Sequence, residues 1–196
     1  MMATYIHIGT HKTASSTIQQ ALRRADGDGR LRETVDYLGK PPANVLTEIV
    51  NAEKPDAKLS KALSAWVGGR SDETIQVVSC EQLSGCAEDG YLNPSVIANI
   101  VSDAFGTDDV KIVVYLRRQD DLVESMYTQF IHQGKDFSFD EFLEGLEHGI
   151  SFDYERIMQA WASFFGPDNL LVRSYHSASR KGVCDDFSEV IGYPGI

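Results

Sequence analysis

The chain has 196 residues, of which 42% are apolar and 24% charged, so its length and composition are those of one ordinary globular domain with a substantial core. Its net charge of −11 argues against a nucleic-acid partner, because phosphate backbones are bound by clustered lysine and arginine. Three cysteines without paired spacing (Cys80, Cys86 and Cys184), no apolar run as long as a membrane span and no signal-peptide pattern predict free thiols in a reducing compartment and no membrane partner. We therefore expect a single cytoplasmic domain over residues 1–196.

Short apolar runs alternate with helical patterns along the chain. The runs predict strands over residues 5–8, 34–38, 74–79, 110–116 and 170–172. Apolar residues at helical spacing predict helices that include residues 18–22, 45–50, 59–67, 94–105, 119–133, 152–165 and 183–191. Alternating strands and helices indicate a doubly wound α/β fold. We therefore expect a parallel sheet of about four or five strands flanked by helices, with a site at the carboxyl ends of the strands.

Local signals refine some of these boundaries. The segment 23–32 is polar and contains glycine, so we expect a surface connection there. Asn93 is expected to cap the helix that begins at Pro94, and Ser138 with Glu141 predicts a capping box that begins a further helix. The run over 110–116 is the most apolar of the chain, which is typical of an interior parallel strand covered on both faces.

The turn between the first strand and the first helix is rich in polar side chains. It carries one lysine and four hydroxyl groups: Lys12, Thr13, Ser15, Ser16 and Thr17. A strand that leads into a helix through such a turn directs backbone N–H groups and the positive helix end at one point, where an anion can bind. The simpler alternative is a hydroxyl-rich helix start with a solvated lysine.

The nucleoside-triphosphate P-loop, G-x-x-x-x-G-K-[ST], does not fit this turn, because counting from Gly9 places Ala14 at the second glycine and Ser15 at the lysine. The turn instead resembles the phosphosulfate-binding loop of sulfotransferases that use 3′-phosphoadenosine 5′-phosphosulfate (PAPS), roughly K-[ST]-G-[ST]-[ST], with Ala14 in place of the usual glycine. The resemblance implies a catalytic role for Lys12. It also implies that the 5′ end of PAPS contacts His11, Lys12, Thr13, Ala14, Ser15, Ser16 and Thr17.

A second motif follows the most apolar strand. Arg117 leaves that strand, and Ser125 lies eight residues later, about two turns along the next helix. Sulfotransferases that this sequence resembles carry the same spacing for the 3′-phosphate of PAPS, which implies that Arg117 and Ser125 bind this phosphate. Arginine suits the task because its planar guanidinium donates to phosphate oxygens at two points. Arg118 occupies a variable family position and is expected to be only a neighbour.

A third motif, Ser79-Cys80-Glu81-Gln82-Leu83, ends the third predicted strand. Sulfonyl transfer to an alcohol or amine needs a base for the acceptor's proton, and a carboxylate beside the phosphate loop is well placed. The motif resembles that of heparan-type carbohydrate sulfotransferases, in which a glutamate in a Ser-Lys-Glu context is the base. The resemblance therefore implies that Glu81 is catalytic, with a structural or acceptor-orienting role as the alternative. Cys80 replaces the lysine, so part of the donor-site charge is missing or comes from elsewhere.

Two histidines near the loop are rival bases, since other sulfotransferases use histidine. His7 lies inside the first strand and is expected to be a packed residue. His11 precedes Lys12, so it could act as the base or contact a phosphate instead.

The resemblance covers nearly the whole chain and implies a three-layer architecture of the P-loop or nucleotide-kinase type. A pattern common in bacterial members includes Tyr154, Trp161, Phe164-Phe165-Gly166, Asn169-Leu170-Leu171-Val172, Asp186-Phe187 and Ile191-Gly192. We interpret its aromatic residues as core and helix packing. Arg180-Lys181-Gly182 is similar to the 3′-phosphate motif R-K-G, but it follows the last strand too closely, and we interpret it as a coincidental basic surface turn.

Three classes of function are compatible with these motifs. The resemblance favours a sulfotransferase that uses PAPS, leaves 3′-phosphoadenosine 5′-phosphate (PAP) and modifies a small-molecule or carbohydrate acceptor. A P-loop kinase needs a magnesium site and a lysine at the helix mouth; Glu81 could be its metal carboxylate, but the lysine is displaced, and we expect no metal. A non-catalytic nucleotide-binding module is favoured if Ala14 or Cys80 disables the site. The acidic charge favours a small or neutral acceptor over a polyanionic glycan.

Overall fold

The computed structural model describes residues 3–31, 33–68, 73–86, 91–149 and 153–196, in which five parallel strands form one sheet. Their order is β2-β3-β1-β4-β5. The bounds are β1 Thr4–His7, β2 Val35–Gly39, β3 Ile75–Ser79, β4 Val110–Leu116 and β5 Leu170–Ser174. The chain passes from central β1 to β2 and β3 on one side, then to β4 and β5 on the other. This arrangement confirms the predicted doubly wound sheet.

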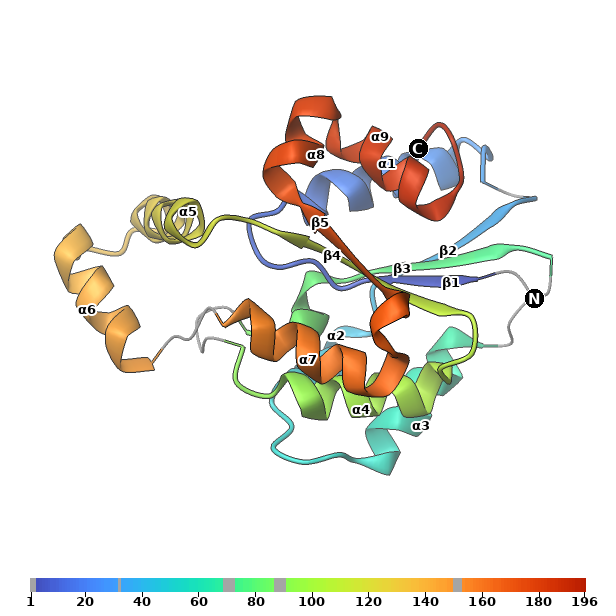
Figure 1. Cartoon of the computed structure of the whole chain (residues 1–196), viewed down its shortest axis with the longest axis horizontal. Helices are drawn as coiled ribbons and strands as arrows, with labels where there is room; N and C mark the ends of the chain where they lie inside the picture. The colour runs from blue at the N-terminus through green and yellow to red at the C-terminus, as the bar shows by residue number, and fades with distance from the viewer. Residues whose placement is uncertain (1–2, 32, 69–72, 87–90, 150–152) are drawn as a thin grey trace.

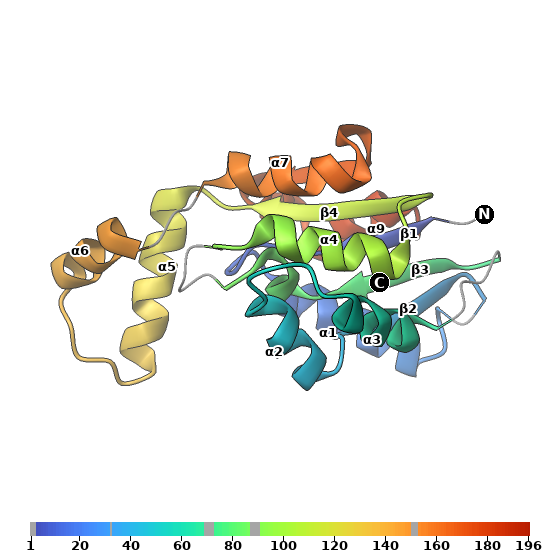
Figure 2. The same cartoon turned by 90° about the horizontal axis from the view of Figure 1, so that it is seen from below.

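Helices cover both faces of the sheet and make three layers (Figure 1). One face carries α1 (Ser15–Gly27), α8 (Tyr175–Lys181) and α9 (Val183–Ile191). The other carries α2 (Ala43–Val50), α3 (Ala57–Val67), α4 (Pro94–Phe105) and α7 (Tyr154–Phe165). Two further helices, α5 (Gln119–His132) and α6 (Phe139–Gly149), stand beyond the carboxyl ends of the strands in both views (Figures 1 and 2). Short 3₁₀ helices span Glu81–Ser84 and Pro167–Asn169.

The side chains of β4 explain why both faces are covered. Successive residues of a strand point to opposite faces, and here both sets are apolar. Ile112 and Val114 pack in the core that also contains residues of α4 and α7, whereas Val113 and Tyr115 pack with residues of α1 and α9. All four side chains are fully buried. The prediction of an interior strand covered on both faces is therefore confirmed.

The structure corrects the boundary of the first helix. Helix α1 continues to Gly27, so the expected surface connection does not begin at residue 23. The reason is that Ala25 extends the buried stripe of Ile18 and Leu22 by one further turn.

Other local predictions have mixed outcomes. The capping box of Ser138 and Glu141 is confirmed, since each residue's backbone N–H donates to the side chain of the other. Asn93 does precede α4, but its side chain donates to the carbonyl of Ala52 and does not cap the helix. The expected start of a helix at residue 152 lies outside the described residues, and α7 begins at Tyr154.

Helix α8 was not predicted, because only Ala178 of its residues is buried and the segment therefore lacks an apolar stripe. Arg180 and Lys181 are its last two residues, so the sequence R-K-G forms a helix end and not a separate turn. Both side chains are exposed. None of the described helices is long and apolar enough to cross a membrane.

Candidate active site

The residues singled out in the sequence gather at the carboxyl ends of β1, β3 and β4. The loop after β1, Glu81 after β3, Arg117 after β4 and one side of α5 surround one cavity of about 450 Å³. All three sequence motifs contribute to its lining, with His11, Lys12, Ala14, Ser15, Ser16, Glu81, Arg117 and Ser125. Two further lining residues, Gln129 and Tyr175, were not suggested by the sequence. Parallel strands place their carboxyl ends on one edge of a sheet, so motifs far apart in the sequence meet there.

Two residues of the loop adopt the left-handed backbone conformation, Lys12 with φ 64° and Ala14 with φ 61°. Ala14 directly precedes α1, and its carbonyl accepts hydrogen bonds from the N–H groups of Thr17 and Ile18. A side chain with a Cβ atom pays about 1–2 kcal/mol in this conformation, which glycine avoids. Lys12 and Ala14 thus adopt a backbone conformation that favours glycine, and this lowers the stability of the protein.

Gly9 keeps the inner side of the loop open. Its φ is 37°, and a Cβ atom there would lie 2.6 Å from Ser15 Oγ and 3.0 Å from His7 Nε2. Ser15 Oγ is buried and has no hydrogen-bond partner among the described residues. A buried polar atom usually has a partner, so this hydroxyl is suited to a ligand at the cavity.

His7 is packed inside the protein, as expected. It is fully buried in β1, and its Nδ1 lies 2.8 Å from Ser79 Oγ. Burial lowers the pKa of His7 to about 4, and the nearby charge of Glu81 opposes this only in part. The imidazole is therefore neutral near pH 7. It is absent from the lining of the cavity, whereas His11 belongs to it.

His11 is held against a buried tyrosine. Its Nδ1 lies 3.3 Å from the hydroxyl of Tyr91, which also accepts the backbone N–H of His11 at 3.2 Å.

The hydroxyl groups of the loop differ in their roles. Thr13 is fully buried, and its Oγ1 donates to the carbonyl of Thr10 at 2.5 Å, so it closes the loop internally. Thr10 in turn donates to the carbonyl of Tyr115 at 3.0 Å and ties the loop to β4, which the sequence did not suggest. Ser16 and Thr17 are exposed at the start of α1, and of these two only Ser16 lines the cavity.

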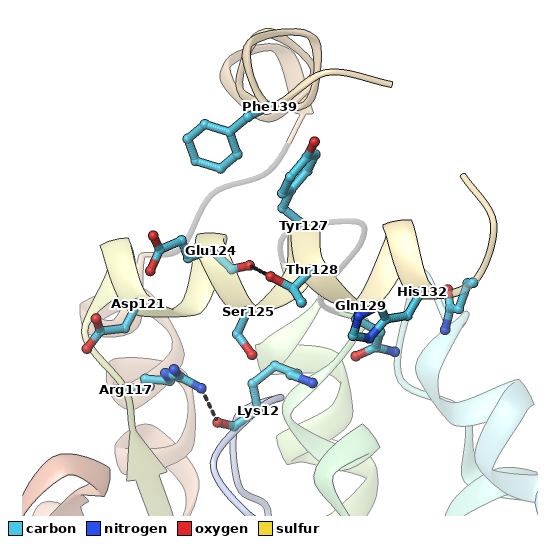
Figure 3. A pocket seen from close by; sticks show the side chains of 11 residues that line it. Lys12, Arg117, Asp121, Glu124, Ser125, Tyr127, Thr128, Gln129, His132 and Phe139 are labelled. Carbon is cyan, nitrogen blue, oxygen red and sulfur yellow. Dashed lines mark hydrogen bonds between the residues drawn. The ribbon is translucent and has the colours of Figure 1, made fainter. Parts of the chain in front are cut away.

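Arg117 is fixed from three directions. Its Nη1 donates to the carbonyl of Lys12 at 3.1 Å, and its guanidinium carbon lies 5.4 Å from the ring centre of Tyr175. Its own carbonyl accepts the hydroxyl of Tyr154 at 3.0 Å. Ser125 points from α5 toward Lys12 (Figure 3). Arg118, by contrast, forms an exposed ion pair with Asp120.

Glu81 begins a 3₁₀ helix after β3, and both of its carboxylate oxygens are bound. Oε1 lies 2.9 Å from Nζ of Lys40, and Oε2 accepts Nε2 of Gln19 at 2.7 Å. Burial alone would raise the pKa of Glu81, but the hydrogen bonds from Lys40 and Gln19 and the charge of Lys40 outweigh it and hold that pKa below its usual value. Glu81 is therefore an ionised carboxylate near neutral pH.

The sequence did not suggest Lys40 or Gln19 as members of the site. Gln19 lies on the same side of α1 as Ser15, and no sequence signal distinguishes it from the neighbouring Gln20. Lys40 directly follows β2 and belongs to none of the three motifs. Cys80 is buried in the core, and burial raises the pKa of its thiol to about 11, so it is uncharged. Position 80 therefore holds no charge near the cavity, whereas Lys40 brings one next to Glu81.

A wider cavity of about 800 Å³ adjoins the first and shares Lys12, Arg117, Ser125 and Gln129 with it. One face of α5 and a residue of α6 form its outer wall (Figure 3). The described residues of that wall include carboxylates, hydroxyl and amide groups and aromatic rings, and no lysine or arginine: Asp121, Glu124, Tyr127, Thr128, Gln129, His132, Gln133 and Phe139.

The charges around the first cavity favour an anion. Neither Lys12 nor Arg117 forms an ion pair with a carboxylate of the described residues. The N-terminal end of α1 faces the same space through Ser15 and Ser16. Cations without a carboxylate partner and a helix N-terminus are features that favour anion binding, here in a protein of net charge −11. The described residues contain no group of three or more His, Cys, Asp or Glu that could hold a metal ion.

Comparison with solved structures places this fold among known ones. The chain is similar to a sulfotransferase from Alicyclobacillus acidocaldarius, with a TM-score of 0.63 and 16% identity over 100% of this chain and 83% of that one. Weaker similarities include a gluconokinase from Sinorhizobium meliloti 1021 (TM-score 0.39, 14% identity, 97% and 95% coverage) and retinol dehydratase in a complex with retinol and PAP (0.45, 15%, 97% and 60%).

No family model and no curated protein matches the sequence. The structural likeness therefore establishes a fold shared with a sulfotransferase, and the activity has to be argued from the site.

Proposed function

We propose that this protein is a sulfotransferase that moves the sulfonyl group of PAPS to a hydroxyl or amine of a small-molecule or carbohydrate acceptor. The observation that carries the proposal is one cavity lined by two cations without a carboxylate partner among the described residues, by Ser15, whose buried hydroxyl has no partner among them, and by an ionised carboxylate. The cations suit a donor with phosphates, and the carboxylate suits an acceptor that loses a proton. The resemblance of the three motifs and the shared fold support the same assignment.

We assign the two ends of the donor to separate parts of the cavity. The N-terminal end of α1, with Lys12 and the hydroxyls of Ser15 and Ser16, binds the 5′-phosphosulfate. Arg117 and Ser125 bind the 3′-phosphate, since the guanidinium is already oriented by the carbonyl of Lys12. Thr13, Ala14 and Thr17 contribute through the shape of the loop and its backbone N–H groups, and His11 borders the same space.

We propose that the acceptor's reacting hydroxyl or amine lies in the first cavity, which Glu81 and Lys12 line, and that the rest of the acceptor extends into the wider cavity along α5, which shares Lys12 with it. The described residues of the outer wall of the wider cavity include carboxylates and no lysine or arginine, which disfavours polyanionic acceptors.

In this proposal Glu81 accepts the proton that the acceptor's hydroxyl or amine loses as its oxygen or nitrogen bonds to sulfur. The bond between sulfur and the oxygen of the 5′-phosphate breaks at the same time, and its electron pair stays on that oxygen. Lys12 stabilises the negative charge that develops there, more in the transition state than in the resting complex. The products are PAP and the sulfated acceptor. His11 is the alternative base.

A binding experiment tests the donor assignment. We expect PAP to bind without added metal and more tightly than adenosine 5′-phosphate, because Arg117 and Ser125 form a site for the 3′-phosphate. Titration calorimetry of both nucleotides in the presence of a chelator measures the difference. Equal affinities would remove the 3′-phosphate site from the proposal.

An activity experiment separates the alternatives. Release of PAP from PAPS, measured with pooled alcohols, amines and sugars in chelator, is the expected result. A kinase would instead consume ATP only when magnesium is added. A non-catalytic module would bind PAP and release none from PAPS with any acceptor.

A further inference from the structure

Lys40 reaches the site because of the strand order. It directly follows β2, the edge strand whose neighbour is β3, and β3 leads to Glu81. Gly39 has φ 79°, a conformation that glycine adopts without strain, and Pro41 follows Lys40. Parallel pairing of β2 and β3 puts the ends of both strands on the same edge of the sheet. Lys40 and Glu81, which are 41 positions apart, therefore meet beside the first cavity.

The carboxylate that Lys40 contacts cannot turn freely. Gln19 is 2% exposed and binds Glu81 Oε2 at 2.7 Å, while the same Nε2 lies 3.3 Å from the carbonyl of Ser79. Lys40 binds Oε1 at 2.9 Å, with its side chain 35% exposed and that of Glu81 20% exposed. One oxygen is thus fixed by a neutral amide and the other by a cation, which leaves lone pairs on both oxygens for a proton.

The position of Glu81 creates an electrostatic conflict for an anionic donor. Lys12 and Arg117 attract such a donor, but Glu81 lines the same cavity and its charge opposes them. A buried carboxylate without a counter-charge also favours its protonated form, and a protonated carboxylate cannot accept a proton. Among the described residues, the only ion pair of Glu81 is with Lys40.

We infer that Lys40 is a positioning residue that cancels the charge of Glu81 toward the anionic donor and keeps the carboxylate ionised for the acceptor's proton. The inference rests on the proposed function and adds to it a residue that belongs to none of the three sequence motifs. A purely structural ion pair at this degree of exposure would contribute little and would leave donor binding unchanged.

The inference predicts a pattern of PAP affinities across four proteins. Lys40→Met leaves the carboxylate uncompensated and weakens PAP binding by about tenfold. Glu81→Gln removes the opposing charge and strengthens binding several-fold. The double variant Lys40→Met/Glu81→Gln has neither charge and returns to within about threefold of the wild type. Titration calorimetry on the four proteins completes this double-mutant cycle, and circular dichroism checks that each is folded.

Two further variants separate a local charge effect from other causes. Lys181→Met removes one positive charge and one surface ion pair, that with Glu189 on α9, so it is a control for net charge and is expected to bind PAP like the wild type. Lys40→Arg retains the charge and is expected to recover most of the affinity. The inference is overturned if Lys40→Met binds PAP as tightly as Lys181→Met, or if the double variant is as weak as Lys40→Met alone.

The test also remains decisive if PAP is not the ligand. Failure of the wild-type protein to bind PAP refutes the proposed donor, and the same cycle is then measured with inorganic pyrophosphate. The same order of affinities with pyrophosphate supports the role of Lys40 at an anion site of another kind. No binding of either anion by the wild-type protein overturns the inference as well.

Discussion

Two carboxylates of this protein are paired with cations at the carboxyl end of the sheet, and their surroundings differ. Asp186 of α9 is 4% exposed and accepts two bonds from Arg173 of β5, at 2.5 and 3.1 Å, and one from the hydroxyl of Tyr115 at 2.8 Å. Glu81 accepts one bond from Lys40 and one from Gln19, and it faces a cavity.

The difference teaches how the same charges serve two purposes. Arginine and tyrosine engage both oxygens of Asp186 and join α9 to β4 and β5, so this pair holds elements together. The pair of Lys40 and Glu81 is open on one side, so the carboxylate keeps access to whatever occupies the cavity. We therefore expect changes at the first pair to appear in stability and changes at the second in binding and turnover.

The largest expected effect is at the open pair. Glu81→Gln keeps the shape of the side chain but cannot accept a proton, so sulfonyl transfer should fall by roughly two to four orders of magnitude. Folding stability should change little. Single-turnover rates with PAPS and a known acceptor, together with urea unfolding, measure both quantities. A wild-type rate in this variant would transfer the role of base to His11 or to another group.

The next effect concerns a cation that belongs to neither pair. Lys12→Ala should lower the single-turnover rate by about 10² to 10³, and donor affinity by less, because the charge of Lys12 acts mainly in the transition state. Lys12→Arg should rescue poorly, since a broad planar group does not replace a compact ammonium in a tight turn. If affinity collapses while bound donor reacts at the wild-type rate, Lys12 only holds the donor.

At the pair of Arg173 and Asp186, Asp186→Asn should reduce the free energy of unfolding by about 2–3 kcal/mol. The loss of the counter-charge of Arg173 destabilises the protein, and the partial exposure of Arg173 limits the loss. PAP affinity should be unchanged. Burial raises the pKa of Asp186, but the bonds from Arg173 and Tyr115 outweigh it and lower that pKa overall. The pair therefore stabilises the protein fully above about pH 4 and loses this contribution as pH falls through the lowered pKa.

Urea unfolding from pH 7 to pH 3 measures this contribution for the wild type and for Asp186→Asn. The difference between the two proteins should shrink toward acid pH. A constant difference would mean that the aspartate acts through packing and not through its charge.

The smallest effect concerns strain beside the open pair. Ala14→Gly should stabilise the protein by about 0.5–1 kcal/mol, because relief of the left-handed conformation exceeds the entropy that glycine adds to the unfolded chain. Thermal unfolding measures the change, with Ala21→Gly inside α1 as a control that should destabilise. A loss of stability in Ala14→Gly would show that the loop is not strained at this position.

The sequence by itself determined most of the elements and the doubly wound class of the fold, because those signals are local. Short apolar runs, helical stripes and a capping box each extend over a few neighbouring residues. The same holds for the polar turn at Lys12 and for the spacing of Arg117 and Ser125, which lie within one strand–helix unit. Parallel strands then imply that all three motifs lie on one edge of the sheet, which the shared cavity bears out.

Only the tertiary structure decided which side chains meet at that edge. Lys40 and Glu81 are 41 positions apart and Tyr115 and Asp186 are 71 apart, and no local pattern indicates that Lys40 contacts Glu81 or that Tyr115 contacts Asp186. The first contact depends on β2 lying beside β3, and the second depends on α9 packing near the end of β4. Both arrangements result from the burial of apolar side chains that are far apart in the sequence. The left-handed turn at Ala14 and the internal bond of Thr13 depend likewise on how the loop is enclosed.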